Sequence, residues 1–277
     1  MSPPGTRADI ASTPLRGYRY AALLSFCLAT PLLIAFRAYV PGGITWLASL
    51  GFALLARDAA FQRRLAVLLG CIALLAVAPI HTDTSTAHFL TLGSAFFLVI
   101  FVPALILHWT DPEAIRFRLW PRTFRWLDVI YVIISVPLSW LAFRLYFGIA
   151  NPDVPHHWLL PVPPSTDSTV RLFIGINLVG LWDELFFINT VYAVFRSMFP
   201  YAVASAAQAV VYTTVLFRMA FTGIGPAIIY VFALTQAAMF EESESLLYVL
   251  LVHVIVDAFL VAAILAHYYA WVPFLHF

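Results

Sequence analysis

Apolar residues run through most of the chain in long blocks, and charged or turn-forming residues separate the blocks. Such blocks with few charges are typical of helices that cross a bilayer. The pattern predicts an all-α, polytopic integral membrane protein with about eight to nine transmembrane helices. The count depends on how the chain divides around Arg218 and the TGIGP stretch (222–226), and on two short windows, the second and the third. The predicted windows are 20–36, 40–56, 65–80, 89–107, 129–149, 172–195, 201–217, 219–240 and 246–266.

The first block, Tyr20 to Phe36, could also be a cleaved signal peptide. It has arginines on both sides, but it is longer than the apolar core of a usual signal peptide. No convincing small-residue cleavage site follows it. We therefore interpret this block as the first transmembrane helix.

Composition supports the membrane assignment. Hydrophobic residues make up 62% of the chain and charged residues 10%, whereas a soluble domain carries about 25% charged residues. The net charge of +1 gives no reason to expect a nucleic-acid partner. Cys27 and Cys71 both fall inside apolar blocks, so we expect packing residues and no disulfide.

The arginines alternate between successive connecting segments. The segments 81–87 and 151–169 contain no basic residue. By the positive-inside rule, this alternation predicts a cell-membrane protein with a cytoplasmic N-terminus. One arginine-rich stretch, 115–127, is either an interfacial helix on anionic lipid or a positively charged loop. The arginines of the predicted cytoplasmic side are Arg7, Arg16, Arg19, Arg57, Arg63, Arg64, Arg116, Arg118, Arg122 and Arg125.

Two adjacent carboxylates, Asp183 and Glu184, interrupt the apolar block between Arg171 and Arg196. A single helix over the 24 intervening residues would be roughly 36 Å long. This exceeds the hydrocarbon core of about 30 Å, so the pair would lie near the midplane, where each charge costs about 3 kcal/mol. Neighbouring carboxylates also repel each other, so we expect a cationic or hydrogen-bonding partner.

The helix around this pair favours a packed, inward-facing environment. Gly180 lies one turn before Glu184, and a small residue there lets a neighbouring helix approach. Asn177 lies two turns before Glu184, where its amide could hydrogen-bond across to that helix. On this interpretation the carboxylates face protein or trapped water.

His253 and Asp257 form a second polar pair, spaced i and i+4 on one helix face. A shielded carboxylate can act as a general base on water, and a nearby histidine can position that water or stabilise an oxyanion. These parts suit peptide hydrolysis inside a membrane. They suit a proton or ion relay in a transporter equally well, and periodicity does not separate the two.

The order of these clusters resembles the CPBP family, the CAAX-protease and bacteriocin-processing membrane proteins also called the Abi family. The usual family pattern is a Glu-Glu pair with Arg four residues after the second Glu, then Phe-x-x-x-His, then His-x-x-x-Asn or Asp. Asp183-Glu184 matches the acidic pair, and His253 with Asp257 matches the last motif. The resemblance covers about residues 165–270.

Two polar residues of the family pattern, the Arg and the His of the middle motif, are absent. Ile188 stands at the position of the Arg, and Asn189 at that of the Gly that often follows it. Phe217 matches the Phe of the middle motif, but Phe221 stands at its His position. Arg218 is either a substitute positive group near the acidic pair or the end of a helix whose side chain reaches the interface.

The resemblance implies a membrane-embedded endopeptidase that uses glutamate-activated water to hydrolyse a peptide bond of a membrane-anchored or prenylated protein. Glu184 or Asp183 would be the general base, His253 would stabilise the oxyanion or position the water, and Asp257 would orient His253. Because of the two replacements, a second interpretation stays open: a catalytically reduced member that binds or regulates a membrane partner.

On this basis the chain divides into a cytoplasmic segment (1–19), N-terminal transmembrane helices (20–160) and a CPBP-like domain (165–270). The expected partners are the lipid bilayer and a membrane-anchored protein or peptide. We predict no cofactor and no metal, because His253 alone would offer a nitrogen ligand to a zinc ion. The other histidines, among them His81 and His88, are interpreted as ends of spans or parts of loops.

Overall fold

The computed structural model describes residues 16–112, 114–115, 118–121, 124–152, 157–158, 160–163 and 165–269. The predicted segment 1–19 therefore lies largely outside the described residues. Within them every regular element is a helix, which confirms an all-α polytopic membrane protein. The elements are α1 (Arg16–Leu33), α2 (Tyr39–Leu55), α3 (Ala59–Val77), α4 (Thr86–Thr110), α5 (Trp126–Leu145), η2 (Tyr146–Ala150), α6 (Thr166–Asp183), η4 (Glu184–Tyr192), α7 (Ala193–Arg196), α8 (Tyr201–Arg218), α9 (Gly225–Ser243) and α10 (Leu246–Tyr268).

These elements form continuous rods that follow the predicted windows. The π-helical segment η2 extends α5, and α6, the π-helical η4 and α7 form one rod, Thr166–Arg196. The described part of the chain then holds 9 helical rods. Of these rods, 5 are long and apolar enough to cross a membrane. They are Ala59–Val77, Thr86–Thr110, Trp126–Ala150, Thr166–Arg196 and Leu246–Tyr268.

The open division around Arg218 is resolved by the backbone. Helix α8 ends at Arg218, and α9 begins only at Gly225. Between them Ala220 and Gly223 have positive φ angles of 72° and 61°, which a right-handed helix does not accommodate. The predicted window 219–240 therefore began too early.

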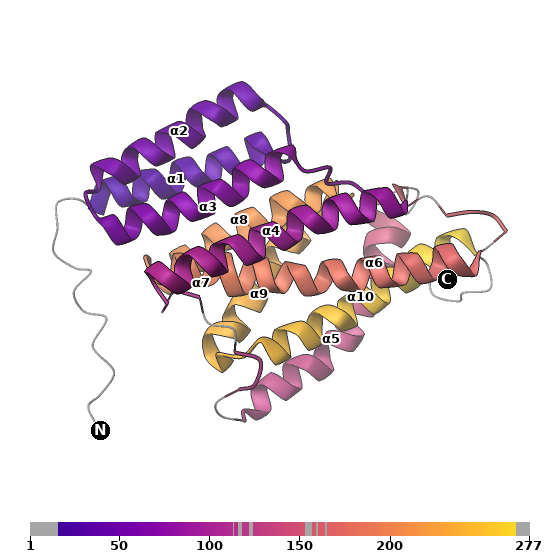
Figure 1. Ribbon diagram of the computed structural model, residues 1–277. Helices are drawn as coiled ribbons and strands as arrows, with labels where there is room; N and C mark the ends of the chain where they lie inside the picture. The colour runs from indigo at the N-terminus through magenta and orange to yellow at the C-terminus, as the bar shows by residue number, and fades with distance from the viewer. Residues whose placement is uncertain are drawn as a thin grey trace.

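The rods run roughly along one axis, with α1, α2 and α3 together at one edge of the bundle (Figure 1). Helix α8 joins this group to the rest because it packs on α1, α9 and η4. Helix α10 packs against α5, α6 and α9. The segment η4 contacts α4, α8, α9 and α10, which places the residues that follow Asp183 at the centre of the bundle.

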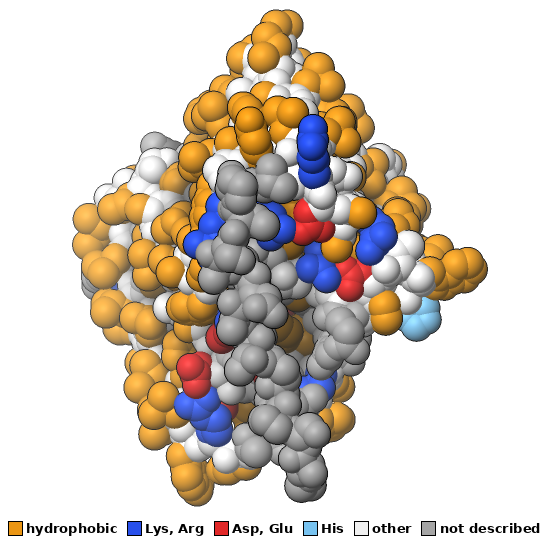
Figure 2. All heavy atoms as spheres, turned by 90° about the vertical axis from the view of Figure 1, so that its left-hand side faces the viewer, with side chains coloured by type: hydrophobic (Ala, Val, Ile, Leu, Met, Phe, Trp, Pro, Cys, Tyr) orange, Lys and Arg blue, Asp and Glu red, His pale blue; other side chains and the backbone are white. Residues whose placement is uncertain are grey.

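Charged side chains gather at one end of the bundle, seen end-on in Figure 2. Arg19 pairs with Asp58 from α1 to the start of α3, and Arg196 lies 2.8 Å from Glu241. The arginine-rich stretch 115–127 reaches the same end. Its described residues before Trp126 are not helical, so the structure favours the charged loop over the interfacial helix.

Many large apolar side chains of α4 and α5 point outward. Phe97 is 55% exposed, Ile133 63% and Leu138 58%. A water-soluble monomer rarely presents so continuous an apolar surface. Together with the apolar rods, this surface fits contact with lipid tails.

Candidate active site

The structure brings together all four predicted site residues. Asp183 and Glu184 lie at the junction of α6 and η4, and His253 and Asp257 lie on α10. All four are buried, with Glu184 at 0% and His253 at 5% exposure. The closest contact joins His253 Nδ1 to Glu184 Oε1 at 2.5 Å.

This contact fixes the roles of the two ring nitrogens. Gln236 Nε2 donates to the same Glu184 oxygen at 3.0 Å, and the Tyr212 hydroxyl donates to it at 3.4 Å. In the neutral form of the ring, a proton on Nδ1 is the one that a carboxylate oxygen such as Oε1 can accept. The other nitrogen, Nε2, then holds a free lone pair.

The two aspartates flank that second nitrogen. Nε2 of His253 lies 3.8 Å from Asp183 Oδ2 and 3.6 Å from Asp257 Oδ1. Both separations are too long for a direct hydrogen bond. Glu184, and not Asp257, is therefore the hydrogen-bonded partner of the ring.

Unsatisfied oxygens lie at the same place. Asp183 Oδ1, Glu184 Oε2 and Asp257 Oδ2 are buried and have no hydrogen-bond partner among the described residues. Buried carboxylate oxygens without a partner are rare in folded proteins. These oxygens can therefore accept hydrogen bonds from a water molecule or a ligand.

Gly180 allows α10 to approach α6 this closely. A Cβ atom at Gly180 would lie 2.0 Å from Asp257 Oδ2 and 2.6 Å from His253 Cδ2. The predicted close approach at Gly180 is thereby confirmed. The amide of Asn177, in contrast, donates to the Phe173 carbonyl of its own helix at 2.8 Å, so the predicted bond across helices is wrong.

The backbone changes its winding at the site. Residues from Glu184 to Tyr192 are π-helical, and Thr190 Oγ1 donates to the Leu185 carbonyl five residues earlier at 2.9 Å. π-Helical segments inside α-helices occur frequently at functional sites. Here the change begins at the second carboxylate of the acidic pair.

Two contact residues, Tyr212 and Gln236, were not predicted. Tyr212 from α8 lies with its hydroxyl 3.2 Å from His253 Nδ1, and it is fully buried. Gln236 from α9 also donates to the Val249 carbonyl at 3.2 Å. Gln236 left a signal, since an amide inside an apolar block often bonds across helices. Tyr212 left none, because a tyrosine is common in apolar helices.

A cavity of about 610 Å³ reaches this cluster. Asp183, Tyr212, His253 and Asp257 line it, whereas Glu184 does not. Most of its wall is apolar and comes from α5, α6, α9 and α10. Glu184 thus meets the cavity through its bonds to His253 and Tyr212, which both line it.

The residues at the two replaced family positions lie apart from the ring of His253. Ile188 is fully buried in the apolar core. Phe221 lies beyond the end of α8 and lines the cavity, stacked on Tyr146 with ring centroids 6.0 Å apart. Arg218 ends α8, and among the described residues no ion pair joins it to the acidic pair.

A second polar cluster, His81, Asp83 and His88, lines the same cavity from the segment between α3 and α4 and from the first turn of α4. The Ser85 N–H donates to Asp83 Oδ1 at 2.8 Å and lowers the pKa of this carboxyl. Burial and the neighbouring His88 lower the pKa of His81. At neutral pH the cluster therefore contains one carboxylate anion and a neutral His81. The sequence HTDTSTAH could have revealed it, because it places two histidines and a carboxylate within eight residues.

Comparison of the chain with protein-family models, with curated proteins and with solved structures gives no match.

Proposed function

We propose that this protein is a membrane-embedded endopeptidase, similar to the CPBP family, that hydrolyses a peptide bond of a membrane-anchored or prenylated protein. The observation that carries the proposal is the buried Glu184–His253 pair, with the second ring nitrogen between two aspartates at the wall of a cavity. Charged groups at membrane depth are costly, so a cluster of this kind favours a functional role.

In the proposed mechanism His253 is the general base that acts on water. Glu184 holds the Nδ1 proton, and this leaves Nε2 basic and directed at the cavity. Nε2 takes a proton from a water molecule held by Asp183 and Asp257, and the water oxygen attacks the carbonyl carbon of the peptide. The carbon–nitrogen bond then breaks, and the proton passes from Nε2 to the leaving amine.

The glutamate of the predicted mechanism thus activates water through the histidine, since Glu184 does not line the cavity. In this mechanism Asp183 and Asp257 bind the water molecule. A rate contribution of about 10²–10⁴-fold is usual for one positioned general base. Loss of either Glu184 or His253 should reduce the rate within this range.

The apolar wall of the cavity supports a lipophilic substrate. A cavity formed between α5, α6, α9 and α10 can receive an apolar peptide segment or a prenyl chain beside the cluster. Peptide bonds of a membrane-anchored protein could reach the same depth as His253. This is the reason to place the substrate in the membrane.

The alternative is a catalytically reduced protein of the same fold that binds or regulates a membrane partner. Phe221 favours it, because at the His position of the family's middle motif it gives the cavity an aromatic wall. The Phe221 ring also lies 6.3 Å from the Trp158 ring. Such a wall would hold an apolar ligand without helping to cleave it.

A cleavage assay tests the proposal. Purified protein in liposomes would receive a library of membrane-anchored peptides, prenylated and not, with products identified by mass spectrometry. We expect cleavage by the parent and a loss of about 100-fold or more in the Glu184→Gln and His253→Ala variants. Asp128→Asn is the matched control, because Asp128 is a buried carboxylate of α5 that does not line the cavity.

Failure of the parent to cleave, with cleavage gained by the Phe221→His plus Ile188→Arg double variant, would favour the binding role. Equal activity in the parent and in Glu184→Gln would contradict the mechanism.

We also propose that the end of the bundle with the ion pairs of Figure 2 faces the cytoplasm, in the cell membrane, because most arginines lie in segments that lead to this end. Labelling of single cysteines introduced at Arg57 and at Thr82 in intact cells tests it. The Thr82 position should react with an impermeant reagent, and the Arg57 position should not.

A further inference from the structure

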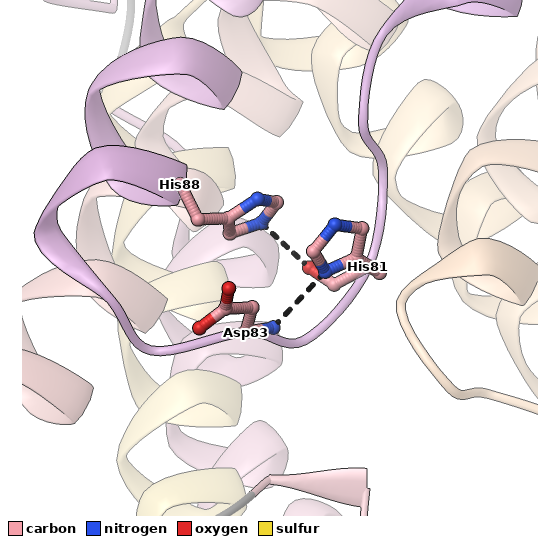
Figure 3. A group of neighbouring side chains, drawn as sticks. All are labelled: His81, Asp83 and His88. Atoms are coloured by element: carbon pink, nitrogen blue, oxygen red, sulfur yellow. Dashed lines mark hydrogen bonds between the residues drawn. The ribbon is translucent and has the colours of Figure 1, made fainter.

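His81, Asp83 and His88 form a compact group of possible metal ligands at the end of the bundle opposite the Arg19–Asp58 and Arg196–Glu241 ion pairs. One ligand atom from each residue lies within 4.8 Å of the others. Figure 3 shows the two imidazole rings facing each other, with the Asp83 carboxylate beside them. His81 and Asp83 are exposed, and His88 is 8% exposed.

Contacts outside the three side chains hold the backbone of this segment in place. Ser85 caps α4 because its side chain accepts a bond from the His88 N–H, and this sets where His88 starts on the helix. Thr82 Oγ1 donates to the His157 carbonyl at 2.6 Å. The position of the cluster therefore follows from a helix cap and from contacts to a neighbouring loop.

The ring of His88 is oriented as metal-binding histidines usually are. Its Nε2 lies 3.0 Å from the His81 carbonyl oxygen, which can only accept, so Nε2 carries the proton (Figure 3). Nδ1 then holds the lone pair. Metal ligands of this type almost always donate their second ring N–H to a carbonyl or carboxylate, which fixes the tautomer.

The other two residues can exchange weak contacts for a metal ion. The bond that His81 Nδ1 accepts from the Asp83 N–H is 3.3 Å long, at the weak end of the hydrogen-bond range. Asp83 Oδ2 accepts from the Ser85 hydroxyl at 3.1 Å, and a carboxylate oxygen has a second lone pair to offer. Neither contact holds its group firmly, and because the two rings are stacked with centroids 3.9 Å apart, the exposed His81 ring must turn for both imidazoles to coordinate one ion.

We propose that His81, Asp83 and His88 bind one divalent transition-metal ion of the zinc type at the rim of the cavity. Two imidazoles and one carboxylate suit Zn²⁺ and its neighbours better than Mg²⁺ or Ca²⁺, which prefer oxygen ligands alone. Three protein ligands leave an open coordination position, as in catalytic zinc sites. The ion would tie the segment 81–85 to α4, where both border the cavity.

This site is separate from the Glu184–His253 cluster and does not depend on the proposed protease activity. His81 and Asp83 lie on the segment that precedes α4, and His88 lies in the first turn of α4. The proposal departs from the prediction of no metal, which was argued from the intramembrane residues, while His81 and His88 were interpreted as ends of spans or parts of loops.

Calorimetric titration of the full chain in detergent with Zn²⁺ is the first test. Co²⁺ provides a second readout, since its visible absorption bands report coordination by nitrogen and oxygen ligands. We expect one ion per chain in the parent. Asp83→Asn and His81→Ala should each weaken binding by about tenfold or more, and Mg²⁺ should not displace the ion.

His108→Gln is the matched control, because His108 is an exposed histidine near the other end of α4. It should bind Zn²⁺ as the parent does. The His88→Gln variant tests the buried ligand. If this variant does not fold, Asp83→Asn still tests the site, because Asp83 is exposed. Unchanged Zn²⁺ affinity in Asp83→Asn and His81→Ala, or loss of binding in His253→Ala instead, would overturn the proposal.

Discussion

The protein contains two clusters of histidine and carboxylate side chains, which differ in their burial and in how far apart their residues lie in the sequence. The intramembrane cluster draws Glu184 and His253 from rods 69 residues apart, and it is buried. The rim cluster lies within residues 81–88 and is mostly exposed. Both line one cavity.

The comparison shows how burial decides what such residues can do. In the intramembrane cluster each charge must be compensated by a partner, because water cannot solvate it. Glu184 accordingly receives bonds from His253, Gln236 and Tyr212. At the rim, water solvates the exposed Asp83 and His81 side chains. These side chains therefore need only weak contacts within the protein, and an ion can replace those contacts.

Removing Glu184 should give the largest effect on stability. Glu184→Ala leaves buried donors of His253 and Gln236 without their acceptor, and breaking a buried pair costs about 3–5 kcal/mol. Unfolding by titration with a denaturing detergent in mixed micelles measures it. Glu242→Gln is the control, because Glu242 pairs with Arg125 at an exposed site, where a pair contributes about 0–1 kcal/mol. Similar losses in both variants would contradict the role of burial.

Gly180→Ala should have the next largest effect. The added Cβ would collide with Asp257 and His253 and force α6 and α10 apart, and overpacking of this kind costs about 1–3 kcal/mol. Gly175→Ala in the same helix is the matched control, since its Cβ would meet Phe89 at an ordinary 3.9 Å. There the better helix propensity of alanine should stabilise the protein by up to about 1 kcal/mol. If Gly180→Ala were as stable as the control, the close helix contact would be wrong.

The smallest effect is expected at the rim in metal-free protein. Because His81 and Asp83 are exposed, His81→Ala and Asp83→Ala should each change the unfolding free energy by about 0.5 kcal/mol or less. The same unfolding titration, carried out with a chelator, measures this change. A loss comparable to that of Glu184→Ala would mean that the rim cluster holds the fold together without an ion.

The sequence predicted the fold class well because the bilayer restricts the possibilities. Apolar blocks that must satisfy their backbone bonds internally become helices, and the windows around α4, α5 and α10 are close to the observed rods. It placed the start of α9 too early, at 219, although the TGIGP stretch at 222–226 left a later division open; the positive φ angles of Ala220 and Gly223 put the break there.

The sequence predicted the four residues of the candidate site but not the contacts among them. Asp183, Glu184, His253 and Asp257 stand out in any apolar sequence, since charge at membrane depth is rare. That Glu184 bonds the ring while Asp257 lies 3.6 Å away depends on the rotation of α6 against α10. Tyr212 joins them only because α8 packs on η4.

The sequence by itself thus determined a helical membrane protein with acidic and histidine side chains at membrane depth. It could do so because the insertion of a segment into a bilayer depends on the hydrophobicity and charge of its own residues. Only the tertiary structure decided that Glu184 contacts Nδ1 of His253 and that Asp183 and Asp257 flank Nε2. Those outcomes depend on helix rotations and on the close contact at Gly180, where a difference of one methyl group decides how near two helices can come.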